Sequence, residues 1–236
     1  MVQLPLQGRT VAVSGAGGSL GQALLQQLHR QGASLVALTT RQETLQLKAA
    51  DGSPIPLRQV TWSCGQEEAL SAVLQDCDLL VINHGFNSHG DRSPDAVERS
   101  LQVNALSSWR LLELFARLAQ ADPPDRPRRE LWMNTSEAEI QPAVSPLYEI
   151  SKRLIGQLFS LRSLDLARSA GGPLRLRRLV LGPFRSDLNP IGLLNADWVA
   201  GQILRQAVDW NCGLVIVTPN PLTYLLMPLA TLSRWG

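Results

Sequence analysis

The chain has 236 residues, of which 44% are hydrophobic and 18% are charged, and its formal net charge is +2. This length and composition suit one soluble α/β domain with a sizeable core. A charge so close to zero excludes a field that would gather nucleic acid. The three cysteines form no C-x-x-C pair, and the three histidines lack partners at metal-ligand spacing. We therefore expect a reducing compartment and no metal site.

The N-terminus has no basic start followed by an apolar run, so no signal peptide is predicted. No stretch reaches about 18 uninterrupted apolar residues, which argues against a transmembrane helix. The expected location is cytoplasmic.

A glycine-rich turn follows the first predicted strand, 10–13, and opens a helix predicted over 22–31. Glycine lets backbone amides approach a pyrophosphate, and a helix N-terminus favours its negative charge. The order strand, turn, helix therefore predicts a dinucleotide site, the alternative being a tight turn without ligand. The predicted contacts are Gly15, Gly17, Gly18, Ser19, Leu20 and Gly21.

The end of the second predicted strand, 33–39, indicates which dinucleotide binds. A carboxylate there would bond the adenine ribose and favour NAD, but the chain has Thr39, Thr40 and Arg41. Hydroxyl groups and a cation suit a 2′-phosphate, so we expect NADP(H) to be preferred over NAD(H). The alternative for Arg41 is a solvated loop arginine.

Two further strands would contribute to the cofactor site. Ser63 and Cys64, at the end of a strand predicted over 58–63, would lie beside the adenine. Asn83, His84 and Gly85 follow the strongly apolar strand 78–82. Asn83 would hold neighbouring strands together, Gly85 would let the backbone approach the cofactor, and His84 would form a wall or face solvent.

The next long helix is predicted over 95–119, with Asn104 inside its apolar stretch. A mid-helix asparagine is mildly unfavourable. It is either a satisfied polar group in the core or a distortion or water link beside an active site. The following stretch, 121–129, holds three prolines and three arginines and is predicted to be a surface loop.

A strand over 130–134 delivers Thr135 and Ser136, and a helix predicted over 148–170 begins with Tyr148. Lys152, one of only two lysines, follows at i+4, so both side chains share one helix face. A nearby cation favours the phenolate of a tyrosine. This pair indicates proton transfer to a carbonyl or alcohol, although the spacing also arises by chance.

The remaining elements continue the alternation of strands and helices. They are a strand over 174–181 ending in Gly182 and Pro183, a helix over 195–210 and a strand over 214–218. This alternation predicts a single doubly wound parallel sheet of Rossmann type covering 1–236. The segment 221–236 is an apolar C-terminal tail. We expect it to join a subunit interface or cover the pocket, with membrane contact less favoured, and it hints at an apolar substrate.

Together these motifs resemble the short-chain dehydrogenase/reductase family over nearly the whole chain. The glycine turn looks like the family's T-G-x-x-x-G-x-G loop, Ile82-Asn83-His84-Gly85 like its N-N-A-G, and Tyr148 with Lys152 like its Y-x-x-x-K. Asn104 and Ser136 match its helix asparagine and catalytic serine. Ser19 replaces a glycine, Gly182-Pro183 reverses the usual order, and the spacing from Ser136 to Tyr148 is one residue short. Thr135 is therefore a rival hydroxyl.

The resemblance implies hydride transfer between a nicotinamide and a carbonyl or alcohol of a small molecule. Tyr148 would be the general acid or base, Ser136 would hold the substrate oxygen, and Lys152 would bond the nicotinamide ribose and lower the tyrosine pKa. Asn104 would hold a water that leads protons to Lys152, and Gly182 and Pro183 would line the nicotinamide. A homodimer or homotetramer is expected. The alternative function is a non-catalytic NADP(H)-binding regulator or scaffold on the same fold.

Overall fold

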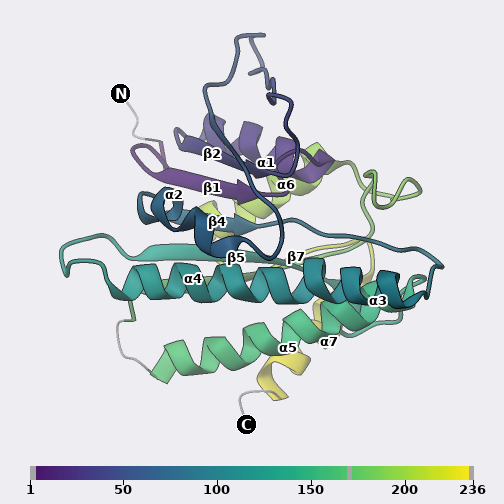
Figure 1. Cartoon of the computed structure of the whole chain (residues 1–236). Coiled ribbons are helices and arrows are strands. Elements are labelled where there is room, and N and C mark those ends of the chain that lie inside the picture. Colours follow the sequence, from purple (N-terminus) through teal and green to yellow (C-terminus); the bar gives the residue numbers. More distant parts are fainter. Residues whose placement is uncertain (1–3, 169–171, 234–236) are drawn as a thin grey trace.

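A seven-stranded parallel sheet forms the centre of the protein (Figure 1). The structure is a computed structural model and describes residues 4–168 and 172–233. The strands lie in the order β3-β2-β1-β4-β5-β6-β7, and each neighbouring pair is parallel. This order confirms the predicted doubly wound α/β domain. The strands are β1 (Thr10–Ser14), β2 (Ser34–Thr39), β3 (Arg58–Thr61), β4 (Leu79–Ile82), β5 (Arg129–Ser136), β6 (Leu174–Leu181) and β7 (Leu214–Val217).

Helices cover both faces of the sheet, with α1 and α6 on one face and α4 and α5 on the other (Figure 1). The helices are α1 (Ser19–Arg30), α2 (Ser71–Gln75), α3 (Pro94–Leu101), α4 (Ser108–Gln120), α5 (Pro146–Arg168), α6 (Ala196–Leu204) and α7 (Pro221–Ser233). Short helical segments are η1 (Glu67–Leu70), η2 (Gln102–Ser107), η3 (Glu137–Glu139) and η4 (Arg205–Asp209). The last two residues of the predicted helix 148–170, and residues 234–236 of the predicted tail, lie outside the described residues.

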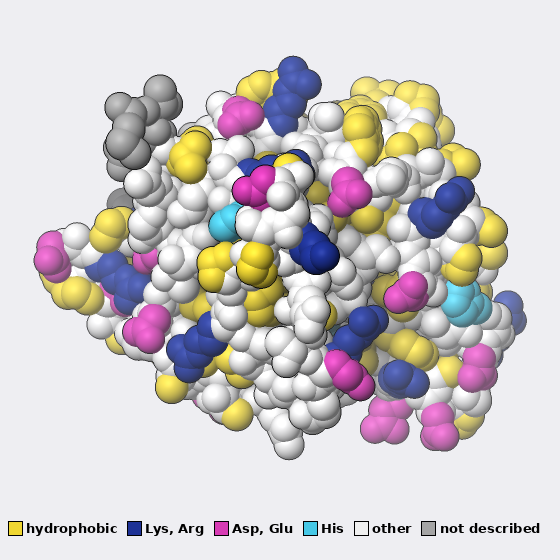
Figure 2. All heavy atoms as spheres, turned by 90° about the horizontal axis from the view of Figure 1, so that it is seen from above, with side chains coloured by type: hydrophobic (Ala, Val, Ile, Leu, Met, Phe, Trp, Pro, Cys, Tyr) yellow, Lys and Arg dark blue, Asp and Glu magenta, His cyan; other side chains and the backbone are white. Residues whose placement is uncertain are grey.

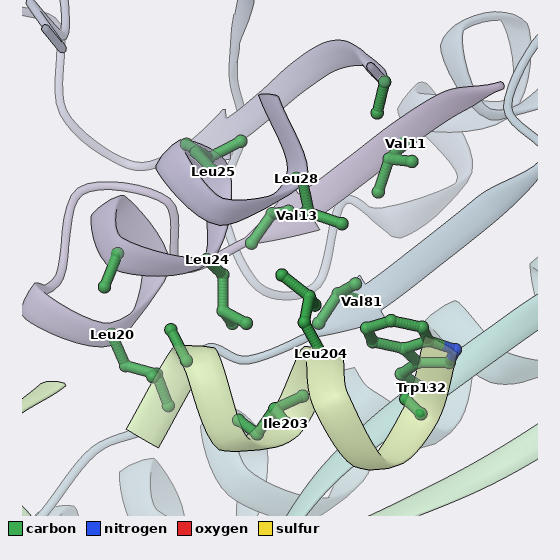
Figure 3. Close-up of a cluster of buried hydrophobic side chains, with 14 of the residues drawn as sticks. Val11, Val13, Leu20, Leu24, Leu25, Leu28, Val81, Trp132, Ile203 and Leu204 are labelled. Carbon is green, nitrogen blue, oxygen red and sulfur yellow. The ribbon is translucent and has the colours of Figure 1, made fainter. Parts of the chain in front are cut away.

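The core consists of two apolar layers because successive strand residues face opposite sides of the sheet. Val11 and Val13 of β1 pack toward α1 and α6, whereas Ala12 between them packs toward the other face. Figure 3 shows the first layer, in which Leu24 of α1 and Ile203 of α6 meet over the sheet. Burial on both faces explains why the central strands read as continuous apolar runs rather than alternating ones.

The structure corrects the prediction of one continuous helix over 95–119. It divides this stretch into α3, η2 and α4. The middle segment, η2, is a π-helical turn that contains Asn104. The predicted helix 195–210 is divided in the same way, since α6 ends at Leu204 and the π-helical η4 follows. Apolar periodicity does not distinguish an α-helix from one with an extra residue in a turn, so the pattern alone predicted continuous helices.

The predicted surface loop 121–129 ends in a residue that is wholly buried. Arg129 has an exposed fraction of 0%, and its guanidinium donates to the carbonyl oxygens of Leu74, Gln75 and Cys77. It also forms a bidentate pair with Asp122, at 2.5 and 2.7 Å. The fork of donors thus satisfies carbonyl groups at the end of α2, a structural role that composition alone did not reveal.

The face of the molecule seen in Figure 2 has no large patch of a single charge. Figure 2 shows basic and acidic side chains interspersed on the face seen from above, in keeping with the net charge of +2. Among residues 4–168 and 172–233, no helix is both long and apolar enough to cross a bilayer.

Candidate active site

A cleft of about 370 Å³ lies at the carboxyl ends of the central strands, where the chain leaves β1, β2, β4 and β5. Ligands bind at this position in open α/β sheets. Most of the predicted site residues line the cleft, namely Gly15, Gly17, Gly18, Ser19, Leu20, Thr39, Thr40, Arg41, Cys64, Asn83, His84, Gly85, Thr135, Tyr148, Lys152 and Gly182. Residues Gly21, Ser63, Asn104, Ser136 and Pro183 are not among its lining residues.

The glycine turn passes tightly between two other segments. Gly15 has a φ of +64°, and an added Cβ would lie 2.8 Å from the Cα of His84. At Gly17 an added Cβ would lie 3.0 Å from Cδ and Nε of Arg41. Gly15 therefore requires glycine, for its conformation and its approach to the residues after β4. At Gly17 a side chain would press on Arg41, which lies over the turn.

Arg41 lies at the cofactor end of the cleft with Thr39 and Thr40. The Thr39 hydroxyl accepts from the backbone nitrogen of Arg41 at 3.1 Å, which fixes the start of the loop after β2. Asp187 is the only carboxylate among the lining residues, and its Oδ2 lies 4.0 Å from a terminal nitrogen of Arg41. This end of the cleft therefore offers a cation and two hydroxyls, with an exposed carboxylate opposite.

His84 forms a neutral wall rather than a base. Ser14 Oγ accepts from the backbone nitrogens of Asn83 and His84, at 3.0 and 3.4 Å. Its own hydrogen is therefore available to His84 Nδ1 at 2.8 Å, which leaves the ring hydrogen on Nε2. Burial, with the Lys152 charge as the next cause, lowers the pKa of His84 to about 4. The imidazole is therefore uncharged at neutral pH.

Asn104 acts as a clamp between three segments. Its Oδ1 accepts from the backbone nitrogen of Phe86 at 2.7 Å, and its Nδ2 donates to the carbonyl oxygen of the same residue at 2.8 Å. Nδ2 also donates to Ser151 Oγ on α5, at 2.9 Å. The side chain is satisfied and lies in a π-helical turn, so the interpretation as a satisfied core polar group is confirmed. The link to the active site through a water stays a prediction. The bonds hold the loop after β4 against the helix that carries Lys152.

Ser136 and Thr135 point their hydroxyls to different places. Thr135 Oγ1 donates to the carbonyl oxygen of Leu179 on β6, at 3.2 Å. Ser136 Oγ accepts from Ala138 N at 3.2 Å and lies 3.4 Å from the carbonyl oxygen of Leu181. Hydrogen bonding to Ser136 lowers the pKa of Tyr148. Thr135 lines the cleft, whereas Ser136 does not.

Tyr148 is half-buried in the first turns of α5. Burial raises the pKa of its phenol, the hydrogen bond with Ser136 opposes that rise, and the charge of Glu137 adds to it. The pKa thus lies above its ordinary value, whereas the family resemblance implies that Lys152 lowers it. Loss of hydration is the larger effect in the free protein.

Lys152 is 4% exposed, and its Nζ donates to the carbonyl oxygen of Asn134 at 3.3 Å. Burial lowers its pKa to about 8, with the charge of Glu139 acting in the opposite direction. Nζ lies 5.6 Å from the centre of the Tyr148 ring. Asn134 in turn donates from Nδ2 to Asn83 Oδ1 at 2.8 Å, so neighbouring strands are held together as expected.

The residues present fit a nicotinamide dinucleotide. Gly18, the residue before α1, provides no side-chain cap, so the first amides of the helix are free to face an anion. The cleft continues from that helix end to Tyr148 and Lys152. A backbone cradle for phosphate and a tyrosine–lysine pair thus share one cavity.

Several residues that line the cleft were not predicted from the sequence. Trp62 lines the cleft where Ser63 was predicted to do so; Ser63 is exposed. The indole of Trp62 meets the His84 ring edge to face at 5.3 Å. The guanidinium of Arg99 lies 4.2 Å from the ring centre of Phe86. The segment after β6 adds Phe184, Ser186, Asp187 and Leu188. No local pattern marks these residues, since they reach the cleft through long-range packing.

The comparisons with known proteins bear directly on this site. A model of the NAD dependent epimerase/dehydratase family matches residues 11–138, more than half of the chain. The chain belongs to this family. The matched segment includes the glycine turn, Asn83, Asn104 and Ser136, and it ends before Tyr148.

Two curated proteins are similar in sequence to this chain. The monoglucosyldiacylglycerol epimerase of Synechocystis sp. is 43% identical over 226 residues, covering 96% of this chain and 53% of that protein. Nodulation protein G of Rhizobium sp. is 35% identical over 115 residues, covering 45% of this chain and 47% of that protein. The chain thus spans about half the length of the curated relatives it matches.

Solved structures support the fold. A short chain dehydrogenase from Burkholderia cenocepacia, solved with NADP, superimposes with a TM-score of 0.72 at 17% identity, covering 99% of this chain and 96% of that one. The resemblance to short-chain dehydrogenases is thus confirmed at the level of the fold. The family model adds that the chain belongs among epimerases and dehydratases that use NAD-type cofactors.

Proposed function

We propose that the protein is an NADP(H)-dependent enzyme that epimerises one secondary-alcohol carbon of a sugar carried on a lipid. The observation that carries the chemistry is the pair of Tyr148 and Lys152 in the cleft that also holds the glycine turn. The substrate class is supported by the relative named monoglucosyldiacylglycerol epimerase, which matches 96% of the chain.

The bound nicotinamide would supply the hydride acceptor for the alcohol carbon and the hydride donor that restores it. Tyr148 would accept the hydroxyl proton during oxidation and return it during reduction. Ser136 would donate to the substrate oxygen, where negative charge develops. The phenol first takes and then returns the proton, so no net proton is required over one turnover. The first step needs the phenolate, which the nearby Lys152 ammonium would favour.

NADP(H) is proposed over NAD(H) because of the groups around Arg41. Its guanidinium lies over Gly17 and beside the hydroxyl of Thr39. A 2′-phosphate would meet a cation and hydroxyl donors there. The proposal of an NADP(H) site rests on this arrangement alone.

The exposed apolar face of α7 is compatible with a lipid-borne substrate. Thr223 and Met227 are buried, whereas six large side chains are 38–69% exposed: Leu222, Tyr224, Leu225, Leu226, Leu229 and Leu232. Among the described residues, none that lines the cleft comes from α7, so this helix does not cover the pocket. Contact of its apolar face with a second subunit or with a lipid surface remains a proposal.

Tyr148→Phe tests the proposed chemistry. We expect the variant to lose interconversion of monoglucosyldiacylglycerol and its sugar epimer, presented in detergent micelles, by at least about 10³-fold, because the proton acceptor is gone. NADPH binding, followed by fluorescence titration, should be retained. Wild-type turnover in the variant would refute the role of the phenol.

The same assay separates epimerisation from the alternatives. If the wild-type chain oxidises NADPH with simple aldehydes or ketones but leaves the glycolipid unchanged, it is a reductase rather than an epimerase. If it binds NADPH and converts neither class of substrate, the non-catalytic alternative holds.

A further inference from the structure

Glu137 is a carboxylate beside the site with no cationic partner. It follows Ser136 directly and opens η3. The other carboxylate of η3, Glu139, is buried and paired with Arg178 at 3.1 Å. Glu137 is half-buried, and within residues 4–168 and 172–233 no arginine or lysine forms an ion pair with it. Its charge is therefore not neutralised within the described chain.

One oxygen of Glu137 is held by a chain of donors. Oε2 accepts from Thr218 Oγ1 at 2.6 Å and from Thr223 Oγ1 at 3.1 Å. Gln141 Nε2 donates to Thr223 Oγ1 at 2.7 Å, so the threonine hydrogen is directed to the carboxylate. Asn220 donates to Gln141 Oε1. The network fixes the carboxylate, and among the described residues Oε1 has no hydrogen-bond partner.

The network lies beside the cleft without lining it. Thr218 packs so closely on Gly182, a lining residue, that an added Cβ there would clash with it. On the other side, Ser136 is coupled to the Tyr148 phenol, and the Glu137 charge reaches that phenol as well. The carboxylate is therefore fixed beside the cleft, next to Ser136 in the chain and joined through Thr218 to the lining residue Gly182.

A carboxylate oxygen is an acceptor only, and its hydrogen bonds to hydroxyl groups are stronger than those of a neutral acceptor. A sugar offers several hydroxyl donors next to the carbon that reacts. We propose that Glu137 is a substrate-binding residue whose Oε1 accepts a hydrogen bond from a sugar hydroxyl adjacent to the reacting carbon. This inference rests on the proposed function and deepens it, because it selects a polyhydroxylated substrate over a simple ketone.

Glu137→Gln tests the inference, since the amide keeps the size of the side chain and removes its charge. Binding of octyl glucoside to the NADP⁺-loaded chain is measured by calorimetry, together with its monodeoxy analogues. For the wild type we expect one analogue to bind about 10-fold more weakly, in line with loss of one charge-assisted hydrogen bond. In Glu137→Gln the parent sugar should bind about 10-fold more weakly, and removal of that same hydroxyl should then have little effect.

A purely structural role for Glu137 gives a different result. In that case Glu137→Gln would weaken the binding of all analogues equally and lower the temperature of unfolding. The dependence of binding on the single hydroxyl would stay intact, and this outcome overturns the inference. So does a wild-type chain that binds no octyl glucoside. Glu68→Gln is the matched control, because Glu68 is an exposed carboxylate paired with Arg117, and its substitution should change no sugar affinity.

The binding assay is independent of turnover, so the two proposals fail separately. If the glycolipid is not epimerised but the loss at one hydroxyl depends on Glu137, the reaction is wrong and the sugar site stands. If the glycolipid is epimerised with an unchanged KM in Glu137→Gln, the reaction stands and the role of Glu137 is wrong.

Discussion

The two halves of the cleft are built from different parts of the chain and in different ways. The cofactor half comes from residues up to the end of β5 and is made largely of backbone: a glycine turn, free helix amides and short polar side chains. The substrate half comes from the start of α5 and the segment after β6. It includes the side chains of Tyr148 and Lys152, and Glu137 lies outside the lining.

This difference matches the extent of the family resemblance. The family model covers 11–138, and therefore the cofactor half, but ends before Tyr148. A phosphate-binding cradle needs glycine at fixed positions because only glycine allows the conformation and the close approach. A substrate site needs particular functional groups in space, and these can be delivered by different segments. Comparison therefore identifies the cofactor chemistry more readily than the substrate.

After Tyr148→Phe, the largest expected effect concerns the hydroxyl at the boundary of the two halves. Ser136→Ala should lower kcat by about 10²–10³-fold, because a donor to the developing oxyanion is lost. Thr135→Val should leave kcat within about threefold and reduce stability by about 1 kcal/mol, since its hydroxyl bonds the Leu179 carbonyl. Steady-state kinetics and urea unfolding of both variants check this. The reverse pattern would make Thr135 the catalytic hydroxyl.

The sequence predicted cleft residues wherever the pattern lies within one segment. Gly15, Arg41 and the pair of Tyr148 and Lys152 follow from spacing along one segment, and all four line the cleft. The clamp formed by Asn104 depends on Phe86 and Ser151, which lie in other segments. No spacing rule reports such contacts.

Glu137 illustrates the same limit more sharply. Its neighbours along the chain, Ser136 and Ala138, give no sign of the hydrogen-bond network that holds its carboxylate. The threonines that hold it come from the end of β7 and the start of α7, more than 80 residues away, with separations of 81 and 86. The apolar segment 221–236 was interpreted by its hydrophobicity, and the polar residue that ties it to the site, Thr223, was overlooked.

Lys152 is expected to lower the stability of the folded protein while it serves the proposed reaction. Its pKa falls from 10.5 to about 8 on folding, so below pH 8 the folded protein holds a charge that burial disfavours. At about 1.4 kcal/mol per pKa unit this corresponds to roughly 3 kcal/mol. Lys152→Met removes that term and loses one hydrogen bond of about 1 kcal/mol. We therefore expect the inactive variant to be about 1–2 kcal/mol more stable at pH 7.

The sign of the pH dependence provides the check. Between pH 8 and 10.5 the unfolded chain binds more protons at this lysine than the folded chain does, so wild-type stability rises with pH. The advantage of Lys152→Met, measured by urea unfolding at pH 7 and pH 9.5, should shrink at the higher pH. A difference that stays constant, or a variant that is less stable at pH 7, would show that the ammonium is not desolvated.

The smallest expected effect is at the far end of the cofactor half. Arg41→Gln should weaken NADPH binding by about 10-fold and leave NADH binding unchanged, because the proposed partner of the guanidinium is the 2′-phosphate, which NADH lacks. A charge-assisted hydrogen bond contributes about 1.5–3 kcal/mol. The low end applies because Arg41 is half exposed and Asp187, 4.0 Å away, competes for the guanidinium. Arg30→Gln, at the exposed end of α1, is the matched control. Calorimetric titration decides the point: tighter binding of NADH than of NADPH by the wild type would assign the cofactor half to NAD(H), and the arginine over Gly17 would then serve the turn rather than a phosphate.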